Sequence, residues 1–371
     1  MGINRRLVLT AGLVACLAAA GGFAHAQQKT VKLGFIGPLS GGAAHHGLAA
    51  RNGFLLAIEH ANASGLPFKI EGVMLDDASD PPTGVNAALK LVNDPEVVAA
   101  IGHWNSPVAL ATTPVFNRAG VPFIVWGAIS PRVTEQNFPF VTRVTPTLVA
   151  ENQPLAQMLA KTKGVKTLAI VSDTSDYGKQ NTTSFTQLFT EAGGKIVGAD
   201  AAPVGTTDFR AMLTRLKALN PDGVYFGGVI TEAGIVRKQM KELGMNIPMY
   251  GISGIYDPKF IEIAGDAAEG SIAGVREAQK NPKSEAMLSA YEAKKFPEPS
   301  SHYTMFAYDA VGILVQAMRE HGTDKAAIAK AVRATSYDGV LGRTTFDENG
   351  QTKVPIAIAL YVVKNGKWEK M

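Results

Sequence analysis

Residues 97–107 read Val-Val-Ala-Ala-Ile-Gly-His-Trp-Asn-Ser-Pro, an apolar run followed by a glycine and, after three residues, by Ser106-Pro107. The apolar run is typical of a buried strand, and Ser before Pro is typical of the N-cap and first turn of a helix. The chain is therefore expected to leave a strand and enter a helix whose first N–H groups have no partner within the helix. These N–H groups and the helix dipole favour a bound anion, whereas the alternative is an ordinary capped turn.

The same order of strand, loop and helix recurs on both sides of this stretch. Strands are predicted at 31–36, 70–75, 97–101, 123–126, 167–171, 195–197, 223–226 and 356–363. Helices are predicted at 48–61, 84–92, 108–118, 147–163, 181–192, 209–219, 232–243, 303–319 and 324–334. Two such series in one chain predict an α/β fold of two lobes, each with a doubly wound parallel sheet.

Doubly wound sheets bind their ligands outside the carboxyl ends of the strands. The loops at these ends are predicted at 37–47, 76–82, 102–107, 126–131, 172–178, 227–231 and 251–257. His103, Trp104 and Asn105 lie in one of them, directly before the helix start at Ser106. A ligand at that helix start would therefore contact His103 and Trp104.

The N-terminus has the pattern of a cleavable signal peptide. Arg5-Arg6 is followed by an apolar stretch and by Ala24-His25-Ala26 before Gln27. Residues 1–26 are therefore expected to direct export to the periplasm, by either the general or the twin-arginine route. A lipoprotein anchor at Cys16 is the disfavoured alternative, because the apolar stretch continues past that residue. No later stretch reaches about 18 uninterrupted apolar residues, the length that a membrane span requires.

The composition excludes several function classes. The chain has 36 Lys and Arg against 32 Asp and Glu, without a basic block, so nucleic acid is not expected as a partner. The one cysteine lies in the signal segment, which leaves the mature chain no disulfide, thiolate metal site or Cys nucleophile. Phosphate-loop, dinucleotide-binding and nucleophile-elbow motifs are missing. His45-His46, with His103 and Asp76-Asp77, lack the spacing of metal ligands. The sequence therefore predicts no cofactor, no metal and no enzymatic activity.

Six segments resemble a known family of transport proteins. They are Phe-Ile-Gly-Pro-Leu-Ser-Gly at 35–41, Asp-Asp-Ala-Ser-Asp-Pro at 76–81, Leu-Val-Asn-Asp at 91–94, Ile-Gly-His at 101–103, Asp-Gly-Val-Tyr-Phe-Gly-Gly at 222–228 and Ile-Ala-Gly-Asp-Ala-Ala-Glu-Gly at 263–270. In this order, over nearly the whole mature chain, they resemble the leucine/isoleucine/valine-type solute-binding proteins of ABC importers. The resemblance implies the type I periplasmic binding fold, in which two Rossmann-like lobes joined by a three-stranded hinge close on a ligand.

The resemblance also implies the division of the chain and its partners. Lobe one would comprise 29–146 plus 277–354, and lobe two would comprise 147–276 plus 355–371. The crossovers would lie near 145–147, 274–277 and 353–356. The protein would act as a monomer that carries a small molecule to the membrane permease of an ABC importer.

In family members that bind α-amino acids, a serine at the strand-to-helix turn and backbone N–H groups of the next loop meet the ligand carboxylate. These positions match Ser106 and 127–129 here, with Ile129 at a position that often carries a Thr hydroxyl. Aromatic pocket positions of the family match Tyr177 and Tyr303, and a first-loop position that is commonly aromatic matches His46. The resemblance therefore implies that a carboxylate binds at the helix start.

Departures from the family pattern point away from an α-amino acid. Leu148 and Ser253 stand where amino-acid binders carry an aspartate and a glutamate, and Val229 replaces a tyrosine of the pocket. A buried ammonium needs a paired charge, and losing that partner costs several kcal/mol. Trp104 and Trp126 instead offer flat apolar walls that would flank an aromatic ring.

The expected ligand is therefore an aromatic or apolar carboxylate, similar to a benzoate or a phenylpropenoate. The alternatives are a branched-chain amino acid, a small amide, or a role as the sensing partner of a receptor kinase. The expected ligand-binding residues are His45, His46, His103, Trp104, Asn105, Ser106, Trp126, Gly127, Ala128, Ile129, Leu148, Tyr177, Val229, Ser253 and Tyr303.

Overall fold

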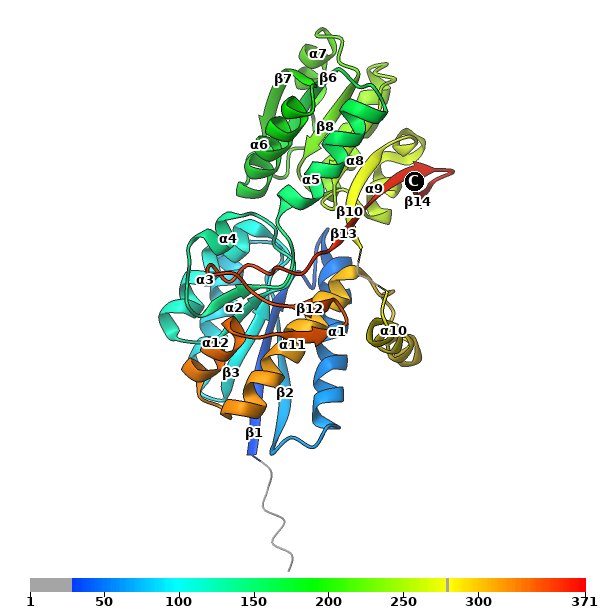
Figure 1. Ribbon diagram of the computed structural model, residues 1–371. Coiled ribbons are helices and arrows are strands. Elements are labelled where there is room, and N and C mark those ends of the chain that lie inside the picture. Colours follow the sequence, from blue (N-terminus) through cyan, green and yellow to red (C-terminus); the bar gives the residue numbers. More distant parts are fainter. Residues whose placement is uncertain (1–28, 278–279) are drawn as a thin grey trace, which may run out of the picture.

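The computed structural model describes residues 29–277 and 280–371, so the expected signal segment 1–26 lies outside the described part. The chain forms two α/β lobes, one above the other in Figure 1, and this confirms the fold predicted from the alternating pattern. Lobe one is built on strands β1–β5, and lobe two on β6–β10, β13 and β14. Among the described residues, no helix combines the length and apolar character needed to cross a bilayer.

Lobe one contains a five-stranded parallel sheet in the order β2-β1-β3-β4-β5. Its strands are β1 (Lys29–Gly37), β2 (Phe68–Asp76), β3 (Val97–Gly102), β4 (Phe123–Val125) and β5 (Val141–Arg143). The central strand β3 is buried along its full length, as expected for an apolar strand with both faces covered. This explains why the sequence at 97–101 shows a continuous apolar run instead of an alternating one.

Helices cover both faces of this sheet. One pair, α1 and α11, packs together in the larger core cluster, and the pair α2 and α3 packs in a second cluster. The helices of this lobe are α1 (Ala44–Asn62), α2 (Pro81–Asn93), α3 (Ser106–Ala119), α4 (Arg132–Glu135), α10 (Pro282–Lys294), α11 (His302–His321) and α12 (Lys325–Arg333). A short hairpin, β11 (Tyr337–Gly339) and β12 (Gly342–Thr344), lies against α11.

Lobe two contains a seven-stranded sheet in the order β14-β13-β10-β9-β8-β6-β7. Its parallel strands are β6 (Thr167–Asp173), β7 (Lys195–Ala202), β8 (Gly223–Gly227), β9 (Met249–Ile252) and β10 (Ile272–Glu277). The late strand predicted at 356–363 is β13 (Ala357–Lys364), and it runs antiparallel to β10. It does so because β10 ends where the chain crosses to lobe one and β13 begins where the chain returns. The last strand, β14 (Lys367–Lys370), pairs with β13 as a hairpin.

The helices of lobe two alternate along the chain with its parallel strands. They are α5 (Leu148–Gln157), which continues into a π-helical segment at Met158–Thr162, α6 (Asp176–Glu191), α7 (Arg210–Lys217), α8 (Ile230–Glu242) and α9 (Pro258–Ala264). The chain passes between the lobes after β5, after β10 and before β13 (Figure 1). The carboxyl ends of the parallel strands of both lobes consequently face one another across the gap.

Candidate functional site

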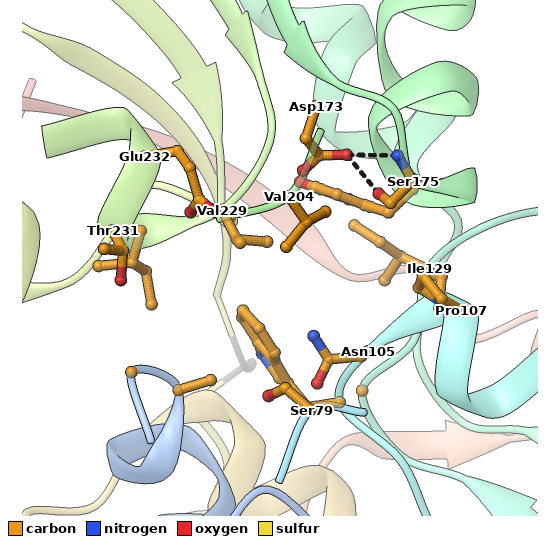
Figure 2. A pocket seen from close by; sticks show the side chains of 18 of the residues that line it. Ser79, Asn105, Pro107, Ile129, Asp173, Ser175, Val204, Val229, Thr231 and Glu232 are labelled. Atoms are coloured by element: carbon orange, nitrogen blue, oxygen red, sulfur yellow. Dashed lines mark hydrogen bonds between the residues drawn. The ribbon is translucent and has the colours of Figure 1, made fainter. Parts of the chain in front are cut away.

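A cavity of about 590 Å³ lies between the carboxyl ends of the two sheets. Loops after β1, β2, β3 and β4 line it from lobe one, and loops after β6, β7, β8 and β9 line it from lobe two (Figure 2). Arg276 of β10 and Tyr303 of α11 complete the wall beside the passages between the lobes. The cavity therefore lies where ligands bind in doubly wound sheets.

Nine of the expected site residues line this cavity. They are Trp104, Asn105, Ser106, Gly127, Ile129, Tyr177, Val229, Ser253 and Tyr303. Side chains that the sequence did not single out also line it, among them Ser79, Asp80, Asp173, Ser175, Val204, Glu232 and Arg276.

Trp104 is an aromatic side chain of lobe one that lines the cavity. The ring of His46 stacks on its indole with 4.9 Å between centroids and 25° between planes. Tyr303 meets the same indole edge-on, at 6.4 Å and 80°. Since His46 is itself buried, the indole is fixed from behind before any ligand binds.

Ser106 opens α3 but is not its N-cap, so that part of the expectation is wrong. Asn105 occupies the N-cap position, and its side chain makes no capping hydrogen bond. The Ser106 hydroxyl is engaged elsewhere, since its oxygen accepts a bond from the Ser130 backbone N–H at 3.1 Å. This tertiary bond leaves the Ser106 hydroxyl proton free to donate, and no acceptor for it is found among the described residues.

The backbone N–H groups of the loop after β4 divide into two sets. Those of Gly127 and Ala128 donate to the carbonyl oxygen of His103, at 3.1 and 2.9 Å, and are therefore occupied. The Ile129 N–H has no acceptor within the described part of the chain. A ligand carboxylate at α3 would therefore meet the Ser106 hydroxyl and the Ile129 N–H.

His103 does not reach the cavity. It is fully buried, and its Nδ1 lies 2.8 Å from Oδ2 of Asp77. The other oxygen of that carboxylate accepts the Ser79 backbone N–H at 2.9 Å. The pair thereby joins the loop after β2 to the loop that carries Trp104. In these two loops, Ser79 Oγ and Asn105 Oδ1 are buried atoms that have no hydrogen-bond partner in the described part of the chain.

A buried ion pair lies beneath the inner end of the cavity, and the sequence did not reveal it. Arg276 Nε lies 2.6 Å from Glu151 Oε1, and both side chains are inaccessible to solvent. Arg276 Nη2 donates to Tyr303 OH at 3.0 Å and approaches Ser253 Oγ at 3.4 Å, while Nη1 donates to Thr145. Glu151 Oε2 accepts both the hydroxyl and the backbone N–H of Ser253, at 2.6 and 3.1 Å. The network joins both lobes to the segments that connect them.

Acidic side chains of lobe two form another part of the wall. Asp173 accepts hydrogen bonds from the backbone N–H and hydroxyl of Ser175, the first at 2.9 Å (Figure 2). Burial raises the pKa of the Asp173 carboxyl. Glu232 Oε1 accepts the Gly205 N–H at 2.8 Å. The expectation that a ligand ammonium would find no charged partner therefore does not hold for this cavity.

Six expected site residues do not line the cavity. They are His45, His46, His103, Trp126, Ala128 and Leu148. Trp126 is fully buried, because its ring stacks on Phe35 at 5.8 Å and meets Tyr303 edge-on at 5.9 Å. Leu148 packs in the lobe-two core, and its N–H donates to the carbonyl oxygen of Ile129 at 3.0 Å. Of the two tryptophans expected at the site, Trp104 lines the cavity and Trp126 does not.

The positions of the His, Cys, Asp and Glu side chains bear on whether the chain could hold a metal ion. In the described part of the chain, no group of three or more His, Cys, Asp or Glu side chains could hold a metal ion. The histidine–carboxylate contacts that the described residues make near the cavity are His103 with Asp77 and His46 with Asp257, and each is a pair.

The chain is similar in sequence and in fold to known proteins. A family profile described as periplasmic binding protein matches residues 30–367. The chain is 31% identical over 346 residues to a leucine-, isoleucine-, valine-, threonine- and alanine-binding protein of Pseudomonas aeruginosa, covering 92% of each chain. A leucine-binding protein of Thermotoga maritima superposes with a TM-score of 0.84 at 29% identity, over 92% of this chain and 97% of that one. A Rhodopseudomonas palustris solute-binding protein of an ABC transporter, in complex with 3,4-dihydroxybenzoic acid, superposes with a TM-score of 0.78 at 26% identity, over 91% and 95%.

Proposed function

Because the chain belongs to the periplasmic binding protein family and is a solute-binding protein of an ABC importer, we propose that its ligand is an aromatic or apolar carboxylate. The ligand would resemble a benzoate or a phenylpropenoate and would bind between the lobes. One observation carries the proposal: a fixed tryptophan and a free hydroxyl donor line the same cavity, side by side in the loop at the start of α3.

The start of α3 supports the carboxylate. The Ser106 hydroxyl and the Ile129 N–H are donors without acceptors among the described residues, and the helix dipole adds a positive potential at this end. Hydrogen bonds from such donors to a charged carboxylate are stronger than bonds between neutral groups. A bound ligand would exclude water from the Ser106 hydroxyl and the Ile129 N–H. A carboxylate at this place would supply the hydrogen-bond acceptors that these two donors then need.

The apolar wall supports an aromatic body. Trp104 from lobe one and Tyr177, Val204 and Val229 from lobe two line the cavity. Its volume of about 590 Å³ lies in the range of small-molecule sites. A planar ring gains offset or edge-on contacts with the indole without displacing His46 behind it. The Rhodopseudomonas palustris protein bound to 3,4-dihydroxybenzoic acid shows that a relative of this fold holds an aromatic acid.

The inner end of the cavity argues against an α-ammonium. The guanidinium of Arg276 reaches the wall there beside Ser253, so a ligand cation would face a buried cation. The nearby carboxylate of Glu151 already contacts Arg276 and accepts two bonds from Ser253. A ligand with a carboxylate and no ammonium avoids this conflict.

The ligand class is tested by calorimetry and thermal shift with benzoate, 3-phenylpropenoate and leucine. We expect the aromatic acids to bind and to raise the unfolding temperature, because a ligand that binds the native state stabilises it. Ser106→Ala should weaken their binding about tenfold, the effect of losing a hydrogen bond to a charge. Ser184→Ala is the matched control, since this hydroxyl lies on α6 outside the cavity and makes no hydrogen bond.

Two results would each contradict one part of the proposal, either the ligand class or the carboxylate anchor. Binding of leucine without binding of either aromatic acid would reject the ligand class. Binding of the aromatic acids with equal affinity by the wild type and by Ser106→Ala would keep the class but reject the carboxylate anchor.

We further propose that residues 1–26 direct the chain to the periplasm, where the mature protein acts as a monomer. The family description supports the compartment, and we propose a membrane permease as the partner that receives the ligand.

A further inference from the structure

Val204 is an apolar side chain that lies on the cavity wall and is nevertheless 60% exposed. It belongs to the loop between β7 and α7, which the sequence did not mark as part of the site. Among the described residues, the other large hydrophobic side chains with high exposure do not line the cavity. They are Met74, Leu89, Val149, Leu219 and Met371. Occupation of the cavity would remove Val204 from water, which makes it a candidate for ligand contact.

The backbone that carries Val204 is held in place on both sides. Gly205 has a φ of +87°, a conformation that favours glycine, and its N–H donates to Glu232 of α8 at 2.8 Å. The hydroxyl and N–H of Thr206 both donate to the carbonyl oxygen of Pro203, at 2.7 and 3.2 Å. The turn at 203–206 is therefore tied to α8 and presents Val204 from a defined position.

The position of Val204 is opposite the loop that carries the tryptophan. In Figure 2, Val204 lies between Val229 and Ile129 and faces Asn105 across the cavity. Trp104 directly precedes Asn105 and lines the same cavity. A ring that lies on the indole would therefore turn its other face toward Val204.

We propose that Val204 is a specificity-determining residue, which covers the face of the ligand ring remote from Trp104 and so selects flat rings over thick ones. This inference rests on the proposed ligand class. A valine is suited to the role because its branched side chain has few rotamers and does not fold away from a ligand. His46 supports the Trp104 indole on one side of the ligand ring, and Val204 lies on the other side. The distance between these two walls is therefore nearly constant.

The test compares benzoate with cyclohexanecarboxylate, which has the same carboxylate on a thicker ring. The wild type should prefer benzoate. Val204→Ala should weaken benzoate binding by up to about fifteenfold, since each buried methylene-sized group contributes about a factor of four and the valine loses two. It should also reduce the preference for benzoate over cyclohexanecarboxylate. Val204→Thr keeps the branched shape, so it should weaken benzoate binding and retain the preference.

Val149→Ala is the matched control, because Val149 is 40% exposed on α5 and lies outside the cavity wall. It should change neither affinity nor preference. If the wild type binds benzoate and Val204→Ala leaves both affinity and preference unchanged, the inference on Val204 is wrong and the ligand class stands. If the wild type binds neither ring acid, the ligand class fails and the inference fails with it.

Discussion

Replacing Glu151 by Gln should strongly destabilise the protein, because it leaves a buried cation without its counter-ion. The Glu151 and Arg276 side chains are 0% and 1% exposed, with 2.6 Å between Oε1 and Nε. Glutamine has nearly the same shape, and its amide oxygen can still accept from Ser253. The change therefore removes the charge and places the amide NH2, a donor, against the Nε–H of Arg276. Breaking a buried pair in this way costs about 3–5 kcal/mol in the free energy of unfolding.

A second cation increases the expected cost. Arg143 is also fully buried, and burial followed by the charge of Arg276 lowers its pKa to about 9. In Glu151→Gln, the buried guanidinium groups of Arg276 and Arg143 would both remain, whereas the negative charge of Glu151 would be gone. The double variant Glu151→Gln with Arg276→Met removes the uncompensated charge and keeps an apolar side chain of similar length. Its cost should be smaller than that of Glu151→Gln alone.

Urea unfolding of the mature chain, followed by tryptophan fluorescence and circular dichroism, measures these free energies. Asp338→Asn is the matched control. It removes one partner of the surface pair between Asp338 and Lys283, whose side chains are 66% and 53% exposed, and should leave the free energy of unfolding nearly unchanged. A cost below about 1 kcal/mol for Glu151→Gln, or a double variant less stable than Glu151→Gln, would refute the assignment of this pair as a mutually compensated buried charge.

Two further predictions concern pH and export. Burial lowers the pKa of His46 to about 3, so on acidification below about 6.5 the unfolded chain takes up a proton that the folded one does not. The free energy of unfolding should therefore fall by about 2 kcal/mol more in the wild type than in His46→Gln between pH 6.5 and 5, and parallel pH profiles in urea titrations would contradict this. If residues 1–26 are a cleaved signal, mass spectrometry of the exported protein should find Gln27 at its N-terminus, and a chain that retains Arg5 after export would disprove it.

The order of strands and helices was predictable from the sequence because it depends on local patterns. Short apolar runs, helical spacing and Gly or Pro in the connections are properties of neighbouring residues. They located the loops at the carboxyl ends of the strands, and with them Trp104, Ser106 and Ile129 on the cavity wall. The loop with Val204 was missed, because the strand predicted at 195–197 continues to Ala202 and its end therefore lies further along the chain.

The direction of a side chain was decided by tertiary packing. Trp104 and Trp126 follow neighbouring strands in similar loops, and no local feature separates them. Trp104 reaches the cavity, whereas Trp126 stacks on Phe35 in the core. The same holds for the start of α3, where the bond from Ser130 engages Ser106 and leaves the N-cap position to Asn105.

The pairing of buried charges likewise required the folded structure. Arg276 lies in β10, a strand that was not predicted from the sequence, and no local pattern identifies its partner. Its partner Glu151 lies far away in the chain, on helix α5 of the same lobe. The sequence determined by itself most of the loops that meet at the cleft, since their order follows from alternation along the chain. Which side chains enter the cleft was decided only when residues distant in sequence packed together, because a buried ring or charge is placed by the groups that surround it.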